Sequence, residues 1–110
     1  MTIQSLRQKL NRLEIFEQRR QEDDYQEFVV FNWQSSDLAE VLSSELGPAV
    51  KPAGMKPSRD FQNLTKKFGG IFDNQTLFKK ESGSAVILAM LWPWSDNEHT
   101  TLKIASVRSN

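Results

Sequence analysis

The chain contains no cysteine and a single histidine, His99, among its 110 residues. The lack of cysteine excludes a disulfide framework, an iron–sulfur site and a thiol nucleophile. A zinc finger is excluded as well, together with every metal site that needs two or more imidazole or thiolate ligands. On this basis we expect a protein that binds no metal and no cofactor.

Long apolar runs are also lacking. The longest, at residues 85–92, is about as long as a strand and less than half of what a membrane-spanning helix needs. In residues 1–13 basic side chains interrupt the leucines, so no unbroken apolar stretch of the signal-peptide kind is present. These two patterns predict a cytoplasmic protein that does not enter a membrane.

The glycine-rich motifs that hold phosphate groups, GxxxxGK and GxGxxG, are absent too. Gly69 and Gly70 are adjacent, but they follow a predicted helix instead of opening one. No serine or lysine nucleophile motif accompanies the single histidine. We therefore expect the chain to have no catalytic activity of its own.

The composition is that of an ordinary globular domain, with 38% hydrophobic residues, 25% charged residues and a formal net charge of zero. A chain of this length buries enough surface to form one core without disulfides or metals. We predict a single domain over residues 1–110. An amphipathic helix and an acidic linker occupy residues 1–24, and a sheet-containing core occupies residues 25–110.

A helical stripe is visible at the start of the chain. Apolar residues recur there at spacings of three and four: Ile3, Leu6, Leu10, Leu13 and Phe16. The spacing predicts a helix over residues 3–21, which ends at the acidic residues 22–24 because negative charge is unfavourable near a helix C-terminus. The stripe has two interpretations. Either the helix packs on its own domain, or Leu6, Leu10 and Leu13 form the seam of a homodimer.

Hydrophobic alternation and turn residues predict the remaining elements. They indicate first a strand at 27–33, with Val29, Phe31 and Trp33 on one face, and then a helix that is capped by Ser36 or Asp37 and ended by Gly47. An irregular loop at 47–57 leads to a short helix that starts after Ser58 and ends at Gly69. Three strands follow, within 71–80, 85–92 and 99–108. The order α-β-α-α-β-β-β predicts an α+β two-layer domain. Its mostly antiparallel sheet has about four strands packed against helices.

The predicted strand at 85–92 does not alternate between apolar and polar residues. Its apolar side chains leave both faces of the sheet, with Val86, Leu88, Met90 and Trp92 on one face and Ile87 and Leu91 on the other. This pattern is typical of a central strand that is covered on both sides. The second and third helices cover only one face well, so the other face needs the N-terminal helix or a second subunit.

Charge is unevenly distributed along the chain. Residues 1–50 hold 5 basic and 9 acidic side chains, residues 51–80 hold 7 and 2, and residues 81–110 hold 2 and 3. The basic middle region contains the candidate ligand-binding residues Lys51, Lys56, Arg59, Lys66 and Lys67. They could bind the phosphates of nucleic acid or of a nucleotide. The alternative is a solvated helix face, because lysines in a last helical turn are favoured by the helix dipole.

Two shorter features remain near the end of the chain. His99 follows Asp96 and Glu98, which suits general acid–base chemistry but equally suits a hairpin turn between two strands. Trp94 follows a proline that ends the preceding strand, so its indole is a candidate for contact with a partner, although it could also cap the core.

Together these patterns favour a small cytoplasmic binding or interaction module. We expect a protein partner or self-association, with Leu6, Leu10, Leu13 and Trp94 as candidate interface residues. The first alternative is nucleic-acid or phosphate-ligand binding through the basic loop and helix at residues 51–67. The second is an enzyme that uses His99.

Overall fold

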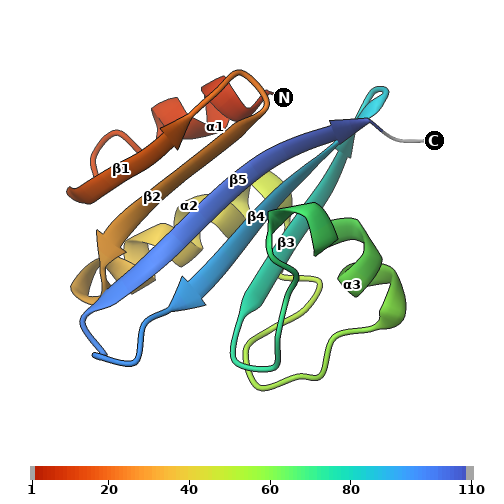
Figure 1. Cartoon of the computed structure of the whole chain (residues 1–110). Coiled ribbons are helices and arrows are strands. Elements are labelled where there is room, and N and C mark those ends of the chain that lie inside the picture. The colour runs from red at the N-terminus through yellow and green to blue at the C-terminus, as the bar shows by residue number, and fades with distance from the viewer. Residues whose placement is uncertain (1, 109–110) are drawn as a thin grey trace.

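The computed structural model describes residues 2–108 and is an α+β domain built on one five-stranded sheet (Figure 1). Its α-helices are α1 (Ile3–Lys9), α2 (Ser35–Leu46) and α3 (Arg59–Thr65), and its 3-10 helices are η1 (Asn32–Gln34) and η2 (Lys66–Phe68). The strands are β1 (Ile15–Gln21), β2 (Tyr25–Phe31), β3 (Thr76–Ser82), β4 (Ala85–Pro93) and β5 (His99–Arg108). They lie in the order β1-β2-β5-β4-β3, and every neighbouring pair is antiparallel.

Strand β4 is the two-faced strand that the sequence predicts. It lies between β5 and β3, where both of its edges are hydrogen-bonded. Ile87 and Ala89 belong to one hydrophobic cluster, whereas Leu88 and Met90 belong to a second cluster on the opposite face. All four side chains are buried, so both faces of the sheet must be covered.

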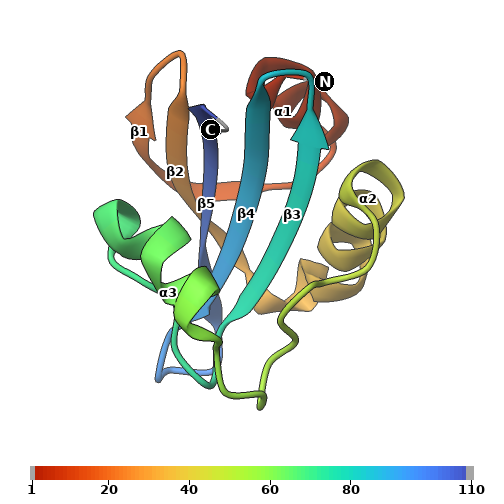
Figure 2. The ribbon, with the colours of Figure 1, turned by 90° about the vertical axis from the view of Figure 1, so that its right-hand side faces the viewer.

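The helices divide between the two faces of the sheet (Figure 2). α1 and α2 lie together on one face, and α3 lies on the other. The predicted pairing of the second and third helices on one face is therefore wrong, as is the two-layer arrangement. The physical reason is the two-sided apolar pattern of the central strands, which a single helical layer would leave half exposed.

The N-terminal segment differs most from its prediction. The helix ends at Lys9 instead of residue 21, and residues 15–21 form β1. The acidic residues 22–24 are the turn of the β1–β2 hairpin, where the Glu22 N–H donates to the Tyr25 carbonyl at 2.8 Å. The element order is thus α-β-β-α-α-β-β-β, with five strands instead of about four. Only Ile15 in β1 is partly buried, so this edge strand carries no apolar alternation that its sequence could reveal.

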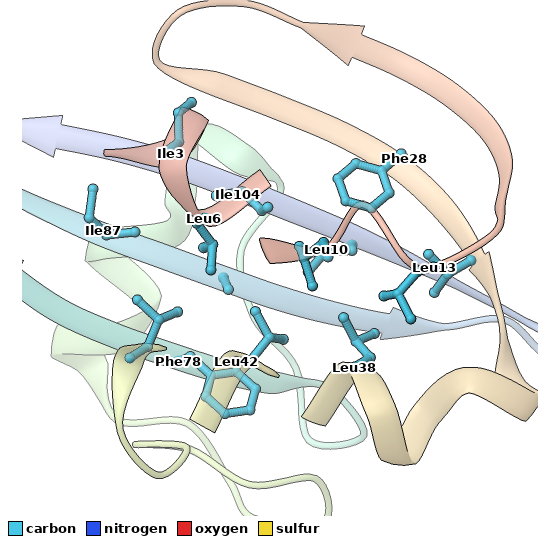
Figure 3. Packing of buried hydrophobic residues seen from close by; sticks show 14 residues of the cluster. Ile3, Leu6, Leu10, Leu13, Phe28, Leu38, Leu42, Phe78, Ile87 and Ile104 are labelled. Atoms are coloured by element: carbon cyan, nitrogen blue, oxygen red, sulfur yellow. The ribbon is translucent and has the colours of Figure 1, made fainter. Parts of the chain in front are cut away.

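The leucine stripe packs on its own domain (Figure 3). Leu6 and Leu10 are fully buried and Leu13 nearly so, and all three share one cluster with Phe28 and Leu42. This packing confirms the interpretation in which the stripe packs on its own domain. Leu6, Leu10 and Leu13 do not form the seam of a homodimer, because their side chains are already enclosed within a single copy.

The other helices follow their predicted boundaries closely. α2 ends at Gly47, and the Ser58 hydroxyl caps α3 by accepting from the Phe61 N–H at 3.2 Å. The expected cap of α2 at residues 36–37 is wrong, because η1 continues directly into the helix. For the same reason Trp33 lies in η1 and not in β2. Among residues 2–108 no helix is long and apolar enough to cross a membrane.

Candidate interaction surface

Part of one sheet face has no helix over it. α3 lies over β3 and β4, and η2 reaches Lys103 of β5 and Tyr25 of β2, which leaves β1 and the rest of β2 and β5 open on this side (Figure 1). We call this region the open face. Two shallow grooves follow it, one of about 390 Å³ between η2 and the β1–β2 hairpin and one of about 400 Å³ beside the end of β4. On the open face, polar and aromatic side chains of the sheet remain accessible.

The first groove contains a hydrogen-bonded tyrosine. The ring of Tyr25 stacks on that of Phe68 with 5.3 Å between ring centroids, and its hydroxyl donates to the Glu27 carboxylate at 2.6 Å. Glu27 also pairs with the guanidinium of Arg19 at 3.6 Å. Burial, and then the bond to Glu27, raise the pKa of Tyr25 above its usual value. The phenol therefore acts in this groove as a neutral donor.

Lys103 lies at the boundary between the open face and the covered face. It is only 8% exposed, its Nζ lies 3.3 Å from the centroid of the Trp92 ring, and it donates to the Phe68 carbonyl at 2.7 Å. Burial lowers the pKa of Lys103, and the nearby Glu27 opposes that shift. The backbone packs closely here, because a Cβ on Gly69 would lie 2.5 Å from a Trp92 ring atom. Lys103 thus holds η2 against the sheet.

Sequence reasoning missed Lys103. A lysine between Leu102 and Ile104 in a strand predicts a side chain that points to solvent. The signal that could have found it is the apolar Ala105 and Val107 on the same face, which shows that this side of β5 is partly covered.

Lys51 is predicted from the sequence to bind a phosphate at the surface, but its side chain is buried. It is 1% exposed, and its Nζ donates to the carbonyls of Phe72, Asp73 and Gln75 at 2.6–2.8 Å. Burial lowers the pKa of Lys51, with Asp73 opposing the shift. The ammonium ties the irregular loop to the turn before β3, so Lys51 is not available to a phosphate on the surface.

The four other basic candidates do lie on the surface. Lys56, Arg59, Lys66 and Lys67 are exposed, and none of them forms an ion pair with another residue in the range 2–108. The ammonium of Lys67 lies 5.2 Å from the centroid of the Phe68 ring and lines the first groove. Lys66 and Lys67 belong to η2 and not to α3, so the predicted basic helix face is divided between two elements.

At the other end of the open face, four rings pack together. Phe16, Phe31, Trp94 and His99 form this cluster, with centroid separations of 4.4 Å between Phe16 and His99 and 4.9 Å between Trp94 and His99. Phe16 is 50% exposed, whereas Trp94 is half-buried and its indole N–H donates to the Thr101 hydroxyl at 2.8 Å. With the neighbouring Trp33, which is 69% exposed, we call this cluster the aromatic end.

Most of the aromatic end was not predicted. Trp94 was a candidate, but Phe16 was assigned to the helical stripe and Trp33 to a strand face. The sequence holds no local signal for the position of Phe16, because β1 is apolar only at Ile15 and Phe16.

His99 and its acidic neighbours form the turn between β4 and β5. The Asp96 carboxylate accepts from the N–H groups of Glu98 and His99 at 2.8 and 3.1 Å, and it lies 2.6 Å from the His99 Nδ1. The bond from the Glu98 N–H, followed by the contact with the His99 ring, lowers the pKa of Asp96. Asp96, Glu98 and His99 are close enough to share an ion, yet the bonds of Asp96 are those of a closed turn.

Replacing Lys51 with methionine should destabilise the fold. The side chain stays long and unbranched, but three carbonyls, one of them in a buried hydrogen bond, lose their donor, so we expect a loss of about 1–3 kcal/mol in the free energy of unfolding. Urea denaturation measures this difference. Lys56→Met is the matched control in the same loop, and its exposed side chain should leave stability within about 0.5 kcal/mol. Equal losses in both variants would contradict the buried role of Lys51.

Tyr25 is the only tyrosine of the chain, so its ionisation can be followed by ultraviolet absorbance. In the folded protein the phenol should stay protonated at a pH of about 10, where an unperturbed tyrosine is half ionised. Because the pKa of Tyr25 is raised by folding, its contribution to stability is present below that pH and is lost as the pH rises through the folded pKa.

The Glu27→Gln variant should lower the pKa of Tyr25, since it removes both the charged acceptor and its field. The urea-unfolded chain provides the reference titration. A native protein whose tyrosine titrates together with the unfolded chain would show that the Tyr25–Glu27 bond does not form.

Comparison of the chain with protein-family models, with curated proteins and with solved structures finds no match. Its chemistry has to be derived from the residues themselves.

Proposed function

We propose that this protein is a small cytoplasmic binding module, without catalytic activity of its own, that recognises a partner protein through the aromatic end. The observation that carries the proposal is the exposure of Phe16 and Trp33, at 50% and 69%, beside a cluster of three further rings. Large aromatic side chains that remain exposed in a folded chain are typical of interface hot spots.

The aromatic end is also held in place, which favours binding. Phe16 makes edge contacts with Phe31 and Trp94, at centroid distances of 5.5 and 6.4 Å. Next to Trp33, the buried side chain of Gln34 bonds both the N–H and the carbonyl of Glu14, at 2.6 and 2.9 Å. These contacts anchor η1 to the N-terminal segment. The ring of Phe16 and the backbone of η1 therefore have little freedom left to lose when a partner is bound.

The ring contacts of His99 support a binding role. Its Nδ1 is engaged by Asp96, and the Asp96 carboxylate is in turn engaged by two backbone N–H groups of the same turn. The imidazole packs between the rings of Phe16 and Trp94. This side chain therefore contributes to the shape of the aromatic end.

Site-specific photo-cross-linking in cells tests the proposal. A benzophenone side chain at position 16 or 33 should give a discrete cross-linked product with a partner protein, or a product of twice the chain mass if the partner is a second copy. The matched control is the same side chain at position 62, because Gln62 is exposed on α3, away from the aromatic end. Equal cross-linking from position 62 would contradict a specific surface.

A second candidate is binding of nucleic acid or a phosphate-bearing ligand through Lys56, Arg59, Lys66 and Lys67. It is favoured by the exposure of these four side chains and by their lack of ion-pair partners within the described residues. The helix dipole offers a simpler reason for the two lysines that end η2. We therefore rank this candidate below protein binding.

Titration of single-stranded RNA and DNA at about 50 mM salt tests the second candidate, because phosphate contacts are strong at low salt and weaken as salt rises. Reversal of the four charges to glutamate should abolish the binding. Reversal of Lys9 and Arg12, which are exposed in the N-terminal segment, serves as the control. If the unmodified protein does not bind at low salt, this candidate is eliminated.

A further inference from the structure

A hollow of about 360 Å³ lies beside Trp33, between η1 and the turn that joins β4 to β5. The end of β2 and this turn meet at the same corner of the sheet (Figure 1). The lining residues are Phe31, Asn32, Trp33, Asn97, Glu98 and His99. The hollow therefore combines three rings with one carboxylate.

The two walls of the hollow are tied to each other. The Asn32 N–H donates to the Glu98 carbonyl at 2.8 Å, and the Thr100 hydroxyl donates to the Asn32 side-chain oxygen at 2.6 Å. On the turn side, Asn97 takes the left-handed backbone conformation, with φ at 60°. The bonds of Asp96 then fix the backbone of Glu98 and His99. The hollow is thus formed before any ligand arrives.

The two carboxylates at this corner are in different situations. Asp96 is engaged by two backbone N–H groups and by the imidazole of His99. Glu98 is exposed and pairs with no cation among residues 2–108. Arg19, which lies over the Trp94 ring, is already shared between Glu17 and Glu27. An unneutralised carboxylate therefore stands at the rim of an aromatic hollow.

We propose that this hollow receives an arginine side chain of the partner protein. The inference rests on the proposed function and specifies the chemistry of its ligand. A guanidinium is planar and weakly hydrated, so it can stack on the Trp33 indole while its N–H groups pair with the Glu98 carboxylate. An acidic side chain would be repelled by Asp96 and Glu98, and a neutral side chain would form no ion pair with the Glu98 carboxylate.

Arginine fits better than lysine for a specific reason. The hollow offers broad ring surfaces, on which a flat group gains stacking contact along its whole area. The lysine ammonium is a compact and strongly hydrated charge, and it must lose more water to reach the same position. We therefore expect the hollow to distinguish the two cations.

Titration of the full-length protein with short peptides tests the inference. The probe is acetyl-Gly-Gly-Arg-Gly-Gly-amide, and the matched peptides carry lysine or citrulline, the uncharged isostere of arginine, at the central position. The readout is the NMR signal of the Trp33 indole N–H, with the Trp92 and Trp94 signals as internal references. We expect a saturable shift at Trp33, with an affinity for the arginine peptide about tenfold above that for citrulline.

Two variants assign the interaction to its residues. Glu98→Gln should reduce the affinity for the arginine peptide to that for citrulline and leave citrulline binding unchanged. Glu81→Gln, which removes an exposed carboxylate at the opposite end of the sheet in the β3–β4 hairpin, should have no effect. The Glu98 carboxylate makes no side-chain hydrogen bond with the described residues, so its replacement should leave the fold intact.

Equal affinity for arginine and citrulline, or for arginine and lysine, would overturn the inference. So would a shift confined to Trp94, or an undiminished affinity in Glu98→Gln. If cross-linking from position 33 succeeds while the arginine peptide fails to bind, the ligand is wrong and the proposed function stands. If the peptide binds while cross-linking fails, the arginine site stands without the proposed protein partner.

Discussion

The fold depends on the burial of both faces of β4 and β5. Along β4, Ile87 and Ala89 pack toward α1 and α2, and Leu88 and Met90 pack toward α3. Burial of one large apolar side chain stabilises a fold by roughly 1.5–3 kcal/mol, so a bare face would forfeit several such contributions. One helical layer cannot supply this cover. The chain therefore places helices on opposite sides of its sheet, including the short α1, whose Leu6 completes the larger cluster together with Leu10 and Leu13 of the segment that follows.

The cover on the two faces is unequal, and this inequality creates the accessible surface. α3 has only seven residues, and η2 extends the cover no further than the start of β2, where the Phe68 ring stacks on Tyr25. Side chains on the open face form hydrogen bonds and ion pairs with one another instead. Tyr25 bonds to Glu27, and Glu27 pairs with Arg19. Lys103 marks the limit of the cover, because its ammonium is enclosed between the Trp92 ring and the end of η2. Beyond that limit the sheet presents polar and aromatic groups to solvent.

The aromatic end results from the sheet order. Phe16 comes from β1, Phe31 from β2, Trp94 from the turn after β4, and His99 from the start of β5. These segments meet because β2 pairs with β5, which brings Phe31 opposite His99. Trp33 and Glu98 are then neighbours across the same corner, joined through the backbone bond between Asn32 and Glu98. A surface assembled from three separate stretches of chain, and anchored by buried groups such as Gln34, is suited to recognition.

The sequence by itself determined the elements whose signals are local. α2 was predictable from its apolar spacing and from the glycine that follows it, and α3 from its Ser58 cap and apolar spacing. β4 was recognisable as a central strand because its residues are apolar on both faces. Tertiary structure alone decided the strand β1, whose exposed side chains carry no periodicity and which pairs with β2 across an acidic turn. It also decided the role of Lys51, since the three carbonyls that bind its ammonium lie more than twenty residues further along the chain. Periodicity reports which face of an element is apolar, whereas the group that meets that face is fixed only when distant segments come together.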